Sequence, residues 1–111
     1  MNLKQSINSR LHDFLMLCKT HNVKSIYAFG SSVTDQFDEE SSDFDFLIEV
    51  DNEDPIQRGE SLMELWDHFE VLFHRKIDLL TNSSIKNPIL KRKIDRTKVL
   101  IYDGKNQEVF I

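Results

Sequence analysis

The stretch Asp43-Phe44-Asp45-Phe46-Leu47-Ile48-Glu49-Val50 alternates between two kinds of side chain along almost its whole length. One face collects Phe44, Phe46, Ile48 and Val50, and the other collects Asp43, Asp45, Leu47 and Glu49. This period of two predicts a half-buried β-strand over residues 43–50. Such a strand points the first two carboxylates to the same side, with their Cα atoms roughly 6.5 to 7 Å apart.

A second strand is predicted just upstream, over Val23 to Phe29, where a β-branched and aromatic run stops at a glycine. Gly30 has no Cβ, so a phosphate group can approach its backbone closely. Ser31 offers a hydroxyl and, at a helix start, an N-cap oxygen. If a short helix begins there, its free N–H groups point at an anion. Gly30 and Ser31 are therefore candidate phosphate-binding residues.

A third strand is predicted over Arg75 to Thr81, with Ile77 and Leu79 on one face and Asp78 on the other. If it lies beside residues 43–50 in the same direction, Asp78 joins the other two carboxylates, but the sequence does not fix that register. Carboxylates pushed together repel one another, and a divalent cation removes this penalty. Two ions about 3.5 to 4 Å apart are the usual arrangement for displacement at phosphorus.

The remaining segments are interpreted as scaffold. Apolar residues at helical spacing predict one amphipathic helix near residues 4–21, which Asn22 ends in a left-handed conformation and in which Cys18 is a core thiol. A second helix opens either at Asp54-Pro55 or at a capping box from Ser61 to Glu64. Trp66 within it is read as a core side chain rather than a platform for stacking bases.

The C-terminal third is predicted to form a helix from Asn87-Pro88 to about Asp95, and then a strand over 99–102. A turn at 103–104 follows, and residues 109–111 are expected to pair back as a terminal strand. The four histidines show no ligand spacing and are assigned to the surface or to helix ends. The order of elements predicts one α/β domain over residues 1–111, with a small mixed sheet backed by helices.

Composition and charge narrow the function classes. The chain has a net charge of −5 and a single cysteine, which excludes an internal disulfide. No leader and no apolar run near the ~20 residues of a membrane helix is found, so a cytoplasmic protein without a membrane partner is expected. Between Lys24 and Arg58 the chain has ten acidic residues and no Lys or Arg. Such a field attracts cations and repels a nucleic-acid backbone, so no direct nucleic-acid binding is expected.

Basic residues gather instead towards the C-terminus, over residues 86–98. Most of them are assigned to a solvated helix face. One or two of them are candidates for neutralising a triphosphate or for meeting an acidic partner.

Phe29-Gly30-Ser31, Asp43-Phe44-Asp45-Phe46-Leu47-Ile48 and the later Asp78 resemble the signature of the DNA polymerase β-like nucleotidyltransferase superfamily. The chain length and the ending 95–102 look most like its minimal nucleotidyltransferase branch. Two positions differ from the family pattern: eleven residues rather than ten separate Ser31 from Asp43, and no Arg follows the Gly-Ser pair.

The resemblance implies a nucleotidyltransferase core that uses ATP and two Mg²⁺ ions. It implies that Gly30 and Ser31 hold the triphosphate, that Asp43 and Asp45 bind the ions, and that Asp78 completes the metal site and helps to deprotonate the acceptor. In the minimal branch it implies an antitoxin that transfers AMP to a tyrosine of a HEPN-domain toxin.

Two other functions stay open on the sequence. The first is a binding module that keeps the fold and neutralises its partner by contact alone, which the missing Arg and the longer loop favour. The second is nucleotidylation of a small molecule such as an aminoglycoside, which usually requires an additional acceptor domain.

Overall fold

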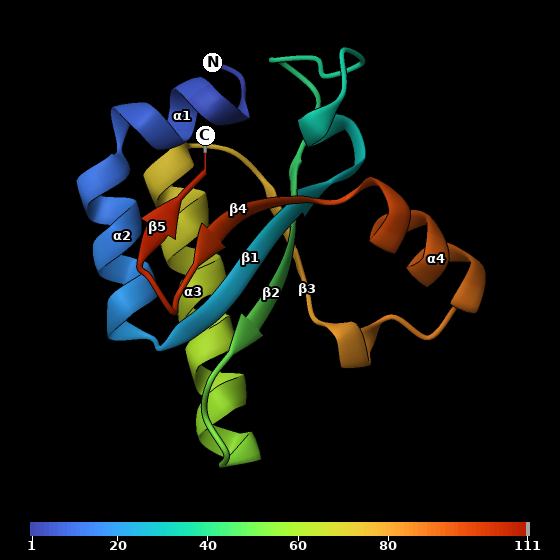
Figure 1. The fold of residues 1–111 in the computed structure, drawn as a ribbon. Helices are drawn as coiled ribbons and strands as arrows, with labels where there is room; N and C mark the ends of the chain where they lie inside the picture. The colour runs from blue at the N-terminus through green and yellow to red at the C-terminus, as the bar shows by residue number, and fades with distance from the viewer. Residues whose placement is uncertain (111) are drawn as a thin grey trace.

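The computed structural model describes residues 1–110, which form a five-stranded mixed sheet with four α-helices and two short 3₁₀ helices (Figure 1). The strands lie in the order β3-β2-β1-β4-β5. The elements, in chain order, are α1 (Leu3–Ser9), α2 (Leu11–Thr20), β1 (Val23–Phe29), η1 (Gly30–Val33), β2 (Phe44–Val50), α3 (Pro55–Phe73), β3 (Ile77–Leu80), η2 (Asn82–Ser84), α4 (Pro88–Thr97), β4 (Val99–Asp103) and β5 (Glu108–Val109).

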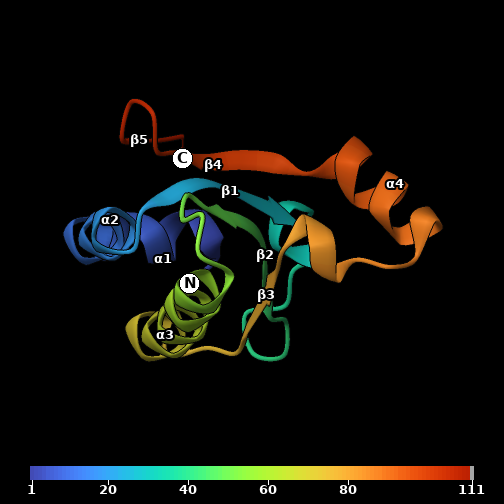
Figure 2. The same cartoon turned by 90° about the horizontal axis from the view of Figure 1, so that it is seen from below.

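Helices α1, α2 and α3 all cover the same face of the sheet, whereas α4 lies beyond the end of the strands (Figure 2). The core between the three helices and the sheet is rich in aromatic rings. Phe14 packs against Phe69 with ring centroids 5.6 Å apart, and Phe46 contacts Phe69 edge to face. The alternation in β2 therefore works as expected, because Phe44, Phe46 and Ile48 face the helices and Asp45 faces the other side.

Strands β2 and β3 run parallel, and α3 is the crossover connection that parallel neighbours require. All other pairs in the sheet are antiparallel. This topology is the mixed sheet backed by helices that the sequence predicts, so the predicted fold class is confirmed.

The N-terminal helix differs from the prediction, because it is two helices broken at Arg10. Arg10 has φ −127° and ψ 29°, and its N–H donates to the carbonyl of Ile7. The break allows Ile7 in α1 and Phe14 in α2 both to be fully buried. Asn22 ends α2 with a φ of +54°, as the sequence predicts, and Cys18 is a core thiol.

The other predicted boundaries are close to the observed ones. Helix α3 begins at Pro55 with Asp54 as its N-cap, which settles the choice between the two predicted starts, and α4 begins at Pro88 with Asn87 as its N-cap. The third strand is shorter than residues 75–81, since β3 covers only Ile77–Leu80. The terminal strand is β5, and Ile111 lies outside the described residues. None of the described helices is long and apolar enough to span a membrane.

Candidate functional site

Parallel pairing of β2 and β3 brings the predicted carboxylates to one place. Asp45 is the direct partner of Asp78 across the two strands. Asp43 lies two residues before Asp45 and therefore on the same side of the strand. Both Asp78 and Asp43 act electrostatically on the carboxyl of Asp45. The register that the sequence leaves open is thus the one that gathers the three acids.

The carboxyl of Asp45 is electrostatically perturbed. Its pKa is raised to about 6, first because the carboxyl is partly buried, and then because of repulsion from Asp78 and Asp43. Asp43 forms a long ion pair with the exposed side chain of Lys76, whose Nζ lies 3.9 Å from its Oδ2. The site therefore carries uncompensated negative charge, which a bound cation would relieve.

Gly30 lies directly against Asp45. Strand β1 places Phe29 opposite Asp45, and the next residue turns away with a φ of +65°. A Cβ built on Gly30 would lie 2.5 Å from Oδ2 of Asp45, which is closer than real Cβ atoms approach. Only glycine fits here, both because of the left-handed backbone and because of the contact with the carboxylate.

Ser31 and Ser32, the two serines after Gly30, have different surroundings. The short helix begins as expected, but its N-cap is Phe29 rather than Ser31, so Ser31 lies inside the helix. Ser32 was missed by the sequence analysis: its Oγ accepts a hydrogen bond of 2.9 Å from the backbone N–H of Asp45. This bond ties η1 to β2 and fixes the backbone that carries the carboxylate. Within residues 1–110 the Ser31 hydroxyl makes no side-chain hydrogen bond.

Three carboxylates are the hard oxygen ligands that Mg²⁺ prefers, so the donor set fits the expected metal. As the side chains stand, however, no three His, Cys, Asp or Glu residues of the described chain form a ready ligand group.

Arg75 is a second residue that the sequence analysis missed. Its guanidinium donates 2.7 Å to the carbonyl of Ser42 and also reaches the carbonyl of Glu39. It lies against two aromatic rings that stack on each other, 5.0 Å from the centroid of Phe37 and 4.9 Å from that of Phe44. Arg75 thereby holds the acidic loop 34–43 that leads into β2. No spacing in the sequence links residue 75 to that loop.

Lys98, the last residue of the basic cluster 86–98, lies over the ring of Tyr27. The Nζ of Lys98 lies 4.5 Å from the ring centroid of Tyr27 and 3.1 Å from Oδ1 of Asp95. Tyr27 pairs with Leu47, which lies two residues beyond Asp45 on β2. Lys98 therefore places a cation on the same face as the carboxylates.

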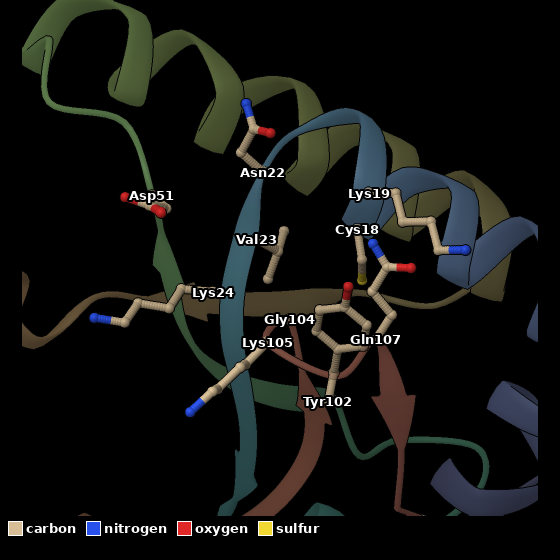
Figure 3. Close-up of a pocket in the computed structure, with 10 residues that line it drawn as sticks. All are labelled: Cys18, Lys19, Asn22, Val23, Lys24, Asp51, Tyr102, Gly104, Lys105 and Gln107. Carbon is tan, nitrogen blue, oxygen red and sulfur yellow. The ribbon is translucent and has the colours of Figure 1, made fainter.

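A separate cavity of about 430 Å³ lies at the opposite end of β1 from Gly30 (Figure 3). Its lining includes Cys18, Tyr102 and Gly104. Burial raises the pKa of the Cys18 thiol, which makes it a poor nucleophile. None of the predicted site residues lines this cavity, so it is not part of the carboxylate site.

Comparison with known proteins decides the family. The family model "Polymerase beta, Nucleotidyltransferase" matches residues 14–107, which is most of the chain. This chain is a polymerase β-type nucleotidyltransferase. A candidate protein adenylyltransferase of Methanocaldococcus jannaschii is 36% identical over 81 residues, which cover 73% of this nucleotidyltransferase and 79% of the relative.

Solved structures agree with this nucleotidyltransferase in fold. A candidate minimal nucleotidyltransferase superposes with a TM-score of 0.60 at 23% identity, covering 89% of this chain and 95% of the other. A toxin–antitoxin crystal structure with AMP-PNP superposes with a TM-score of 0.62 at 17% identity, covering 86% and 76%. The predicted membership in the superfamily, with likeness to its minimal branch, is thus confirmed.

Proposed function

We propose that this nucleotidyltransferase transfers AMP from ATP to a tyrosine hydroxyl of a partner HEPN-domain toxin, and so acts as its antitoxin. The observation that carries the proposal is the carboxylate group around Asp45, which lies in a nucleotidyltransferase fold and against a glycine that leaves room for phosphate. The relatives named as candidate protein adenylyltransferases support a protein acceptor. Two of the solved toxin–antitoxin structures with this fold support a toxin as that protein.

The step is a displacement at the α-phosphorus of ATP. The acceptor oxygen forms a bond to that phosphorus, the bond to the β-phosphate oxygen breaks, and pyrophosphate leaves. Asp78 accepts the hydroxyl proton, because it lies beside Asp45 at the open face of the sheet. Gly30 and Ser31 hold the triphosphate through backbone N–H groups and a hydroxyl. Asp43, Asp45 and Asp78 would hold Mg²⁺, which when bound neutralises charge on the transferring group.

The direct test incubates the purified protein with labelled ATP, Mg²⁺ and a HEPN-domain toxin as the candidate partner. We expect label on a tyrosine of the partner, and loss of partner toxicity. The double variant Asp43→Asn plus Asp45→Asn should lower label transfer at least about a hundredfold. Asp35→Asn plus Asp51→Asn is the matched control, since it removes the same charge from two exposed positions.

A second function is favoured by two particular observations. No basic side chain directly follows Gly30 and Ser31, and the carboxylates do not stand as a ready ligand group within the described residues. On this alternative the protein neutralises its partner by covering it. Full protection of cells by the Asp43→Asn plus Asp45→Asn variant, with no label on the partner, would replace transfer by this binding function.

A further inference from the structure

A hollow with mainly apolar walls runs along the outer edge of β3, between that strand and α3. Its main part has a volume of about 700 Å³, and two smaller hollows of about 350 and 290 Å³ share lining residues with it. We call this the β3-edge groove and define it by six of its lining residues: Glu60, Leu62, Met63, Glu64, Trp66 and Leu79.

The backbone of β3 is open at one position within this groove. The N–H of Ile77 donates 3.1 Å to Glu70, and its carbonyl accepts a 2.7 Å bond from Nε1 of Trp66, so α3 side chains satisfy both groups. Alternate residues of a parallel strand face the same way, so Leu79 also directs its N–H and C=O outward, away from β2. In residues 1–110 these two groups have no recorded partner outside the sheet.

Further along the same edge, Thr81 donates its N–H to Oγ of Ser84, so the open edge is a single residue long. One extended residue of another chain can pair there, whereas a long strand cannot. This limited opening also fits the general need of proteins to protect sheet edges from unwanted pairing.

The charge around the groove is acidic on balance, since Glu49 and Arg58 offset each other in the smallest hollow. Glu60 and Glu64 line its main part, where no Lys or Arg is found among the lining residues. Asp67 and Glu70 line one adjoining hollow, with Lys76 as its one basic lining residue. A second copy of this chain would bring the same acidic rim against itself, whereas a basic segment would be attracted.

We propose that the β3-edge groove binds an extended, basic segment of the acceptor protein, which seats one apolar side chain beside Trp66 and pairs its backbone with Leu79. The inference rests on the proposed function, because it takes the bound segment to belong to the protein that receives AMP. Addition of a strand at a sheet edge is a recurring mode of peptide recognition.

Strand geometry then places the acceptor hydroxyl. Side chains of directly paired residues point to the same face of a sheet, so the residue opposite Leu79 enters the groove on the α3 side. Its immediate neighbours in the segment point to the other face, which is the face of Asp78. The acceptor residue is therefore expected next to the apolar anchor in the partner's sequence.

Trp66 makes the groove directly measurable, because it is the single tryptophan of the chain. The probe is a short synthetic peptide with a central Leu-Tyr flanked by lysines. We expect this peptide to shift the emission of Trp66 in a saturable way. The same peptide with glutamates in place of the lysines, and a version N-methylated at the leucine, should each bind at least about tenfold more weakly.

A pair of matched variants tests the location. Met63→Lys should weaken the lysine peptide at least about tenfold, while Val71→Lys should leave its binding unchanged. Both residues are exposed on α3, at 63% and 70%, but only Met63 lines the groove. Equal binding by wild type and Met63→Lys would overturn the proposal. So would the absence of any Trp66 response at millimolar peptide, or a self-association through β3 that Met63→Lys abolishes.

The binding readout separates this inference from the proposed function. A saturable Trp66 response without label on the peptide tyrosine would support the groove and count against transfer. If Met63→Lys labels the intact partner protein as strongly as wild type does, transfer is supported and the proposed role of the groove is wrong.

Discussion

The carboxylate of Asp45 is in an electrostatically unfavourable environment. Its carboxyl is pushed towards the protonated form because it is partly buried and faces two like charges. The fold retains this unfavourable group near the start of β2, where an asparagine of the same shape would avoid the repulsion. Such retention is typical of residues kept for function rather than for stability.

The pKa of Asp45 predicts how stability depends on pH without metal. A carboxyl whose pKa is raised to about 6 on folding stabilises the protein fully below its unfolded pKa of 3.8, and this stabilisation is lost as the pH rises through about 6. In EDTA, Asp45→Asn should therefore be more stable than wild type at pH 7.5, by about 1 kcal/mol after allowance for solvent screening. Urea unfolding at pH 4 and pH 7.5 measures this. An equal difference at both pH values would contradict it.

Gly30 is predicted to tolerate no side chain. Gly30→Ala forces a left-handed backbone on alanine and drives its Cβ into Oδ2 of Asp45, so we expect a loss of about 1 to 3 kcal/mol in the free energy of unfolding. Gly59→Ala is the control, because nothing lies within 4 Å of a Cβ there and helix α3 gains a better helix former. Chemical denaturation of both variants should give changes of opposite sign.

Among the secondary-structure elements, β2 and the starts of α3 and α4 could be predicted from the sequence. Each is decided by neighbouring residues: alternation in β2, and a capping side chain before proline at Asp54-Pro55 and Asn87-Pro88. The break at Arg10 could not be predicted, because it depends on burying Ile7 and Phe14 together. The pairing of Asp45 with Asp78 likewise depends on where α3 returns the chain.

The side of the strand on which each carboxylate lies could be predicted from the sequence, because apolar and polar side chains alternate along β2 and β3. The residues that support the carboxylates could not be predicted. Ser32 and Arg75 act across 13 and 33 positions of the chain, on the N–H of Asp45 and the carbonyl of Ser42. Single hydrogen bonds between segments so far apart leave no periodic pattern in the sequence.

The contacts of Arg75 predict that this residue holds the acidic loop 34–43 in place as one unit. Arg75→Met should leave the sheet intact but release residues 34–43, because it removes two backbone hydrogen bonds and the stacking on two rings. We expect limited proteolysis within the loop to become several times faster. Lys76→Met is the control, since its side chain is 72% exposed and lies 3.9 Å from its one carboxylate partner. Equal cleavage rates in the two variants would show that Arg75 does not hold the loop.

On the scale of the molecule, three helices and one sheet face share a single aromatic core. Phe14 is fully buried and contacts Phe69, Phe73 and Tyr102, so it joins α2 to α3 and to β4. The opposite face of the sheet carries the carboxylates. Because the aromatic core lies on one face and the proposed site on the other, substitutions in the two layers should have separable effects.

Loss of the central ring should therefore affect the whole fold. Phe14→Ala should cost about 3 to 5 kcal/mol, a large part of the 5 to 15 kcal/mol typical of whole proteins. Phe110→Ala, at a ring that is 45% exposed, should change stability by less than about 0.5 kcal/mol. Urea melts monitored by circular dichroism compare the two. A similar midpoint for both would contradict the placement of the core.

The way Arg75 holds the loop before β2 determines which loop residues can be replaced. Its guanidinium donates to main-chain oxygens of Glu39 and Ser42, which every amino acid possesses, and contacts one loop side chain, the ring of Phe37. The identities of Glu39 and Glu40 are thereby released from the task of holding the loop, whereas that of Phe37 is not, because its ring contacts the guanidinium. Substitutions at these two exposed positions should therefore alter the surface that the loop presents while leaving its attachment to Arg75 intact.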